Sequence, residues 1–427
     1  MNTRTPLENP SATVVLSITF NDDCSCFAVG LNTGFCIFHA ETCTLRTTRD
    51  FNAGVGLVQM MGKANYVGLV GGGRQPKFAA NKLIIWDDLK SKAALEISAL
   101  TPVRGVQLSK EHIVVVLQNS VRVYKFAKPP NLLSAYETAN NPWGLCCLSP
   151  KRIAFPGRTT GHVQLVETAT GNVSIIPAHT SAVKAIQLSP DGELLATASE
   201  TVSRRSRCCS PRPCMAADGC FQGTLIRVFA TSNCARLVEL RRGIDPATIF
   251  SLAFNPSGTM LACTSDKSTL HIFDIPHPKR PSRQYLQQQQ QQQQSHQQNA
   301  GAGAGPASDG GGNGGDGRGK WGILAKIPMM PRMFSDVYSF ASAPFEVDDE
   351  GDGTAGSGLL GGLPVSESTT LGTSKPPKGV IGWIGENTLL VVGAGRDARW
   401  EKFVVQEGPD GRRRCVREGW KRYLSGL

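Results

Sequence analysis

One short element recurs along the chain and constrains the fold more than any other feature of the sequence. In each copy a run ends in an aromatic or β-branched residue, and polar residues follow. The copies are CIF (36–38), IIW (84–86), RVY (122–124), QLV (164–166), RVF (227–229) and HIF (271–273). Their spacing is 38 to 48 residues apart from one interval of 63. A period of about 40–45 residues with four strands per repeat is typical of β-propeller blades.

The repeat predicts an all-β fold, a seven-bladed WD-repeat-like β-propeller that forms one domain over residues 11–427. Short runs rich in Val, Ile and Phe alternate with Gly, Asn, Asp and Pro turns, and long amphipathic helical patterns are absent. Trp86-Asp87 is the single intact Trp-Asp dipeptide among the copies, so the repeat is degenerate. The expected blades cover residues 11–50, 51–98, 99–140, 141–178, 179–233, 234–345 and 376–427.

The long interval indicates extra sequence in the fifth blade. The segment LSPDGELLATAS (188–199) matches FNPSGTMLACTS (254–265) at an offset of 66, whereas Phe229 matches Phe273 at an offset of 44. The 22 additional residues are 201–222, which have no strand pattern. They are either a genuine loop or translated intron sequence, and we favour the second.

Low-complexity sequence interrupts the sixth blade and precedes the seventh. Residues 276–320 hold an unbroken glutamine run and many glycines, and residues 346–375 are acidic and rich in Gly. Such compositions bury too little apolar surface to offset chain entropy, so we expect disorder in both. Order is expected to return near Pro376, where IGWIGENTLLVVGAG and ARWEKFVVQ read as two strands.

Composition and motifs exclude several classes of protein. The net charge of +11 is spread without the dense basic stripe of a duplex-binding protein, so we expect no nucleic acid partner. No apolar run reaches the about 18–20 residues of a membrane span, and the N-terminus lacks a secretory pattern. The sequence contains no phosphate loop, nucleophile elbow or HExxH motif, so we do not expect an enzyme. The scattered cysteines should be reduced, and the following four lack the paired spacing of a zinc site: Cys208, Cys209, Cys214 and Cys220.

The most informative motif is Leu240-Arg241-Arg242-Gly243. Consecutive side chains of a strand point to opposite sides, so Arg241 and Arg242 would serve two different pockets. The planar guanidinium donates bidentately to phosphate oxygens, which makes arginine a fitting residue for each. Gly243 has no Cβ and permits a tight bend. A bare Arg-Arg pair is usually a solvated strand end, and the sequence around this one favours binding.

With its surroundings, the motif resembles that of the PROPPIN family of β-propellers, called WIPI proteins in animals. Its Leu form is similar to the branch that includes yeast Hsv-type proteins. The resemblance implies a non-enzymatic adaptor whose ligands are phosphatidylinositol 3-phosphate and 3,5-bisphosphate, with no other cofactor. It extends through FNDDCSCFAVGLNTGFCIF (20–38), VGLVGGG and KLIIWDD (within 67–88), NNPWGLCCLSP (140–150) and GTLIRVF (223–229).

By this resemblance, two groups of side chains would hold the lipid headgroups. Arg241 goes with a group toward the fifth blade: His179, Ser181, Lys184, Thr197 and Ser199. Arg242 goes with a group toward the sixth blade: Ser265, Lys267, Thr269 and His271.

The stretch WGILAKIPMMPRMF (321–334) occupies the place where the family carries a membrane-inserting loop. The alternative is that part of it completes the sixth blade, although residues 335–343 fit that strand better. The side chains expected to enter the membrane are Trp321, Ile323, Leu324, Ile327, Met329, Met330, Met333 and Phe334.

In the first blade, Asn21 and Asp23 match positions that contact the lipid-transfer scaffold of autophagy in the Leu branch.

The resemblance therefore implies a cytoplasmic monomer that binds phosphoinositide-containing membranes. These would be vacuolar, endosomal or vesicular and pre-autophagosomal membranes, where the protein would recruit partners in autophagy and membrane dynamics. The alternative is a protein-only WD-repeat interaction scaffold whose lipid sites have decayed.

Overall fold

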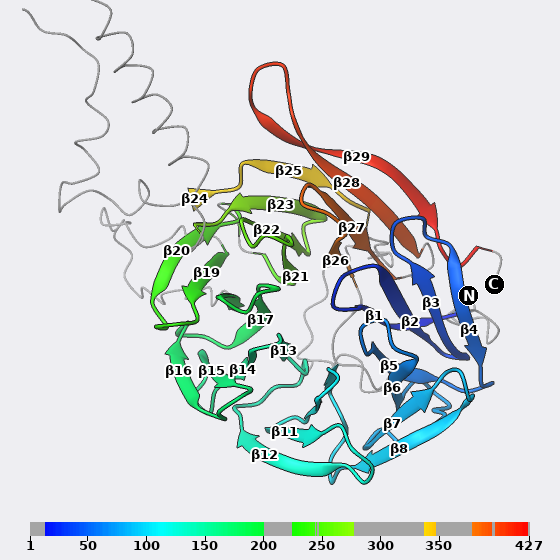
Figure 1. Ribbon diagram of the computed structural model, residues 1–427. Coiled ribbons are helices and arrows are strands. Elements are labelled where there is room, and N and C mark those ends of the chain that lie inside the picture. The colour runs from blue at the N-terminus through cyan, green and yellow to red at the C-terminus, as the bar shows by residue number, and fades with distance from the viewer. Residues whose placement is uncertain are drawn as a thin grey trace, which may run out of the picture.

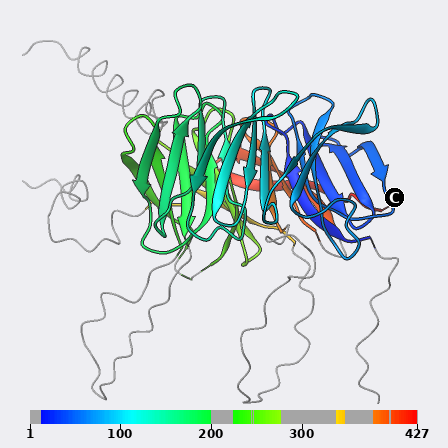
Figure 2. The same cartoon turned by 90° about the horizontal axis from the view of Figure 1, so that it is seen from below.

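The chain folds into seven β-sheets arranged as the blades of a propeller (Figure 1). Seen edge-on, the blades form a disc whose strands cross its thickness (Figure 2). This architecture confirms the predicted all-β, seven-bladed propeller. The computed structural model describes residues 13–199, 224–243, 245, 247–276, 337–346, 378–394 and 398–425.

The first four blades are antiparallel four-stranded meanders. The first contains β1 (Val15–Phe20), β2 (Cys26–Leu31), β3 (Gly34–His39) and β4 (Leu45–Asp50). The second contains β5 (Val55–Met60), β6 (Tyr66–Gly71), β7 (Lys82–Asp87) and β8 (Lys92–Ser98). The third contains β9 (Gly105–Leu108), β10 (His112–Val116), β11 (Ser120–Lys125) and β12 (Asn131–Glu137). The fourth contains β13 (Cys147–Leu148), β14 (Arg152–Pro156), β15 (His162–Glu167) and β16 (Val173–Pro177).

The last three blades carry the candidate site and close the ring. The fifth contains β17 (Val183–Leu188), β18 (Leu194–Ser199), β19 (Leu225–Ala230), β20 (Arg236–Arg241) and, at its outer edge, β24 (Val337–Tyr338). The sixth contains β21 (Ile249–Phe254), β22 (Met260–Ser265), β23 (Thr269–Asp274) and β25 (Ala341–Pro344). The seventh contains β26 (Val380–Trp383), β27 (Thr388–Val392), β28 (Arg399–Glu407) and β29 (Arg413–Arg422).

The boundary between the fifth and sixth blades differs from the expected break after residue 233. Strand β20 pairs with β19 and closes the fifth blade, with Leu225 opposite Arg241. The two arginines therefore stand at the end of the fifth blade's fourth strand and do not open the sixth blade. The stretch from Pro376 onward also holds four strands, where two were expected, because turns divide the first predicted window and β29 follows the second.

The sixth blade is interrupted in sequence, as predicted. Strands β23 and β25 pair with each other, with His271 opposite Ser342, although residues 277–336 separate them and lie outside the described residues. Residues 335–343 were expected to supply this blade's last strand, and β25 begins within that window.

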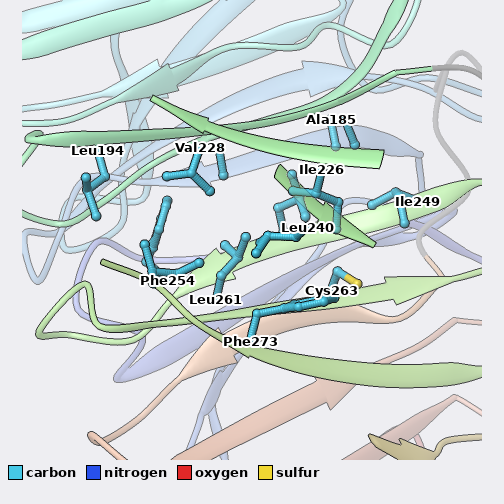
Figure 3. Packing of buried hydrophobic residues seen from close by; sticks show 14 residues of the cluster. Ala185, Leu194, Ile226, Val228, Leu240, Ile249, Phe254, Leu261, Cys263 and Phe273 are labelled. Atoms are coloured by element: carbon cyan, nitrogen blue, oxygen red, sulfur yellow. The ribbon is translucent and has the colours of Figure 1, made fainter. Parts of the chain in front are cut away.

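Apolar side chains fill the space between the fifth and sixth blades (Figure 3). Ile226 and Leu240 of the fifth blade pack against Leu261 and Cys263 of the sixth, and each of the four is 0% exposed. Because strand side chains alternate, the neighbours of these residues on β18, β19 and β20 face the fourth blade. This alternation decides which way each residue of the arginine motif points.

The ring closes between its first and last blades. Trp400 Nε1 donates a hydrogen bond to the Ala40 carbonyl at 2.8 Å. The Tyr423 ring meets Phe27 and Phe38 edge-on, with ring centroids 5.6 and 5.5 Å away. Buried contacts of this kind join chain segments almost the whole sequence apart and fix the disc that carries the site.

Candidate functional site

The two arginines lie at the outer edge of the fifth blade and point to opposite sides. Leu240 is fully buried against the sixth blade. Arg241 follows it in β20 and so turns toward the fourth-blade side, the side shared by Glu239. Arg242 turns back toward the sixth blade, and its backbone N–H donates to the Thr224 carbonyl at 3.3 Å. The motif therefore presents one guanidinium to each of two neighbouring spaces.

On the fourth-blade side, a buried histidine anchors the first candidate site. His179 is 6% exposed, and its Nε2 lies 2.9 Å from Thr197 Oγ1. Burial and, to a lesser extent, the charge of Arg227 lower the pKa of His179 to about 4. The imidazole is therefore neutral at physiological pH and available as a hydrogen-bonding group.

Arg227, which the sequence reasoning did not single out, connects the histidine to the end of β20. Its Nη1 donates to the Ala178 carbonyl at 2.7 Å, and its Nε donates to Glu239 Oε2 at 2.8 Å. Arg236 reaches the same carboxylate at 3.2 Å. Burial alone raises the pKa of Glu239, but hydrogen bonding to Arg227 and the charges of Arg227, Arg236 and Arg241 outweigh it and lower the pKa. One carboxylate thus faces three arginines, so this side keeps an excess of positive charge.

The remaining members of the first predicted group lie around this network. Ser199 ends β18, two residues beyond Thr197 and on the same side of the strand. Ser181 precedes β17 and is half-buried. Lys184 extends toward the fourth blade, where its Nζ lies 5.0 Å from the centre of the Trp143 ring. His179 and Thr197 are thus in direct contact, whereas Lys184 stacks on an aromatic ring.

On the sixth-blade side, Arg242 is buried with incomplete hydrogen bonding. Its residue exposure is 7%. Its Nη2 donates to Thr269 Oγ1 at 2.6 Å, but its buried Nε has no hydrogen-bond partner among the described residues. A buried donor without an acceptor costs about 1–3 kcal/mol, and an anion would supply the missing acceptor.

His271 faces Arg242 from the sixth blade. It pairs with Cys263 on β22, whose side chain belongs to the core between these two blades, so the imidazole points the same way. Burial and, to a lesser extent, the charge of Arg242 lower the pKa of His271 to about 4. Its Nδ1 lies 2.9 Å from Ser339 Oγ, a contact that the sequence did not indicate.

Ser265 and Lys267 complete the second predicted group near the turn between β22 and β23. Ser265 is fully buried, and its Oγ accepts from the Lys267 backbone N–H at 3.4 Å. The Lys267 side chain is exposed. The structure thus brings Thr269 and His271 to Arg242 and keeps Lys267 at the rim of the same turn.

The two predicted partner-binding residues of the first blade differ in exposure. Asn21 is 3% exposed, and its amide donates to Ser25 and to the Gly62 carbonyl while its Oδ1 accepts from the Cys26 N–H at 2.9 Å. Asp23 is exposed and forms an ion pair with Lys63 at 2.8 Å. Asn21 therefore stabilises the turn, and Asp23 is the member of the pair that a partner can reach.

Several predictions concern residues outside the described ranges. The stretch 321–334 with its eight apolar side chains is one, and the insertion 201–222 with its four cysteines is another. Within the described part of the chain, no cluster of three or more metal-binding side chains occurs, and the nine cysteines there are free thiols. No helix in these ranges is long and apolar enough to span a membrane.

Fold and site together define a class: a seven-bladed propeller that presents one arginine on each side of the fourth strand of its fifth blade. The family model of the PROPPINs matches residues 14–284, and the chain belongs to this family, as its motif led us to expect. PROPPINs are phosphoinositide-binding, autophagy-related propellers that associate peripherally with membranes, and they are typically non-enzymatic binding proteins.

Similar proteins cover nearly the whole chain. SVP1-like protein 2 of Neurospora crassa is 53% identical over 99% of this chain and 99% of the relative. SVP1-like protein 2 of Emericella nidulans is 52% identical over 86% of this chain and 99% of its own. Among solved structures, Kluyveromyces lactis Hsv2 matches with a TM-score of 0.65 and 18% identity, covering 96% of this chain and 100% of that one. KlAtg21, solved in complex with the coiled coil of AgAtg16, matches with a TM-score of 0.56 and 18% identity, covering 96% and 99%. At these identities the two structures bear on the fold alone.

Proposed function

We propose that this protein is a peripheral membrane adaptor that binds phosphatidylinositol 3-phosphate and phosphatidylinositol 3,5-bisphosphate at two sites. Arg241 with His179, Thr197 and Ser199 forms the first, and Arg242 with Thr269 and His271 forms the second. The adaptor acts on vacuolar, endosomal and pre-autophagosomal membranes, where it recruits partners in autophagy.

The observation that carries the proposal is the state of Arg242. Its guanidinium is buried, one nitrogen lacks an acceptor among the described residues, and the facing imidazole is neutral because its pKa is about 4. A structural arginine at such a place would be satisfied by a carboxylate or by carbonyl oxygens. A phosphate ester supplies several acceptor oxygens and matches the planar fork of arginine.

Two sites on one rigid edge give avidity. Once one headgroup is bound, the second lipid is held at a high effective concentration, so the two affinities reinforce each other. Headgroup contacts alone are modest and sensitive to salt, and stable anchoring generally takes a second signal. We assign that signal to the apolar stretch 321–334, whose lysine and arginine neighbours would meet anionic lipid.

Partner recruitment is assigned to exposed turns away from the two arginines. The solved complex of KlAtg21 with the coiled coil of AgAtg16 supports a role of this kind for a related propeller. In this chain Asp23 is the exposed candidate for contacting a lipid-transfer scaffold.

Vesicle flotation tests the proposal. We expect the wild-type protein to float with phosphatidylcholine vesicles that contain phosphatidylinositol 3-phosphate and to stay at the bottom without it. Arg241→Thr and Arg242→Thr should each weaken flotation, and the double variant should abolish it while keeping the native circular dichroism spectrum. Equal flotation of wild type and double variant would instead favour the protein-only scaffold.

A further inference from the structure

We propose that Ser339 is a positioning residue of the second lipid site: it holds the His271 imidazole so that its other nitrogen donates to the bound phosphate. The inference rests on the proposed function. It adds to the site a residue that follows the interruption of the sixth blade in the sequence.

The backbone places Ser339 on the Arg242 side of the motif. Strand β24 runs parallel to β20 at the outer edge of the fifth blade, with Val337 opposite Leu240 and Tyr338 opposite Arg241 (Figure 1). Alternation sends the next side chain, Ser339, to the side that Arg242 occupies. Phe340 then donates its backbone N–H to the Ile272 carbonyl at 3.0 Å, so the chain crosses from one blade to the other at this residue.

The contact of Ser339 with His271 is specific. Ser339 Oγ lies 2.9 Å from His271 Nδ1, and His271 stands on the same side of the sixth blade as Thr269, the hydrogen-bond partner of Arg242. Among the described residues, the titratable and charged groups facing this imidazole are Arg242, which follows β20, and the Cys263 thiol from β22. Burial raises the pKa of Cys263 to about 12.

A hydroxyl at this place is compatible with the tautomer that a bound phosphate needs. A neutral imidazole has one donor and one acceptor nitrogen, and only the tautomer with the proton on Nε2 can donate from Nε2 to a phosphate oxygen. A serine hydroxyl can donate or accept, and by donating to Nδ1 it stabilises this tautomer when a phosphate accepts from Nε2. When the imidazole is protonated, both nitrogens donate and no tautomer has to be selected. The contribution of Ser339 should then be smaller.

The test isolates the second site by using the full-length Arg241→Met protein. Its probe is inositol 1,3-bisphosphate, the soluble headgroup of phosphatidylinositol 3-phosphate, and affinity is measured by calorimetry. We expect Ser339→Ala to weaken binding about three- to tenfold, as the loss of one hydrogen bond does, and Ser339→Thr to retain binding. Ser342→Ala is the matched control, since this exposed serine pairs with His271 across the strands and should leave affinity unchanged.

Two further measurements separate positioning from mere support of the strand. In a His271→Ala background, Ser339→Ala should have no additional effect. The penalty of Ser339→Ala should also shrink as the pH falls from about 7 toward 4, because the pKa of His271 is about 4 and its imidazole becomes protonated there. A penalty that persists without His271, or that is independent of pH, would overturn the inference. So would unchanged affinity of Ser339→Ala.

Failure of the proposed function gives a different result. If the wild-type protein does not bind the headgroup or the lipid, both proposals fall. If the Arg241→Met protein binds and Ser339→Ala binds equally well, the lipid site stands and only the role of Ser339 is refuted.

Discussion

If Arg242 is buried for a ligand, as we propose, it should contribute little to folding, and its replacement by an apolar side chain of similar length tests this. Arg242→Met removes the hydrogen bond to Thr269, which, being charge-assisted, is worth about 1.5–3 kcal/mol. The same substitution removes a buried Nε without a partner, which costs the folded state about 1–3 kcal/mol. These contributions oppose each other, so the free energy of unfolding should change by less than about 1 kcal/mol.

Arg227→Met is the matched control. It leaves the Ala178 carbonyl without its donor and Glu239 with a weaker set of partners. The side chains of Arg227 and Glu239 are 23% and 26% exposed, so solvent reduces the loss, and unfolding should become easier by about 2–3 kcal/mol. Urea denaturation followed by tryptophan fluorescence measures both variants. A decrease in the free energy of unfolding as large for Arg242→Met as for Arg227→Met would refute the reasoning and show that Arg242 stabilises the fold.

Three other predictions concern the histidine, the first blade and the insertion. The pKa of His179 is lowered from 6.5 to about 4 in the folded protein, so the unfolded chain binds more protons between these values. The free energy of unfolding should therefore fall by on the order of 3 kcal/mol as the pH drops through this window. In His179→Asn the urea midpoint should depend less on pH than in the wild-type protein. Equal pH dependence of the two midpoints would contradict this. Asn21→Ala should lower stability by about 1–3 kcal/mol because it removes buried hydrogen bonds. Asp23→Ala should leave the urea midpoint nearly unchanged and weaken capture of the scaffold partner in pull-downs; the reverse pattern would count against our assignment. Deletion of residues 201–222 should preserve folding and flotation, since β18 and β19 pair outside that segment; an unfolded or non-floating deletion variant would show that the segment is required.

Much of the fold was predictable because each blade repeats a local pattern. The apolar runs that contain Phe38, Trp86, Tyr124 and Phe273 each lie in the third strand of a blade, and their period alone identifies a propeller. The boundary at β20 was not predictable in this way, because the alternation from Arg236 to Leu240 suits either the last strand of one blade or the first of the next. Its pairing with β19, a contact between strands, decides the question.

The features of the candidate site that depend on residues adjacent in sequence could be predicted. Alternation along one strand sends Arg241 and Arg242 to opposite sides, and this follows from their adjacency. Arg227 was missed because its pairing with Glu239 depends on the register between two strands. Ser339 was missed because it reaches His271 only after the chain has returned from the interruption in the sixth blade. Contacts of this kind depend on register and topology, which one sequence does not reveal.

The most direct test of the account is the number of headgroups that one protein molecule binds. Titration calorimetry with inositol 1,3-bisphosphate should give two sites for the wild-type chain, one for Arg241→Met, one for Arg242→Met and none for the double variant. A single site that survives both substitutions, or no binding by a folded wild-type protein, would contradict the claim that the paired arginines form two phosphoinositide sites.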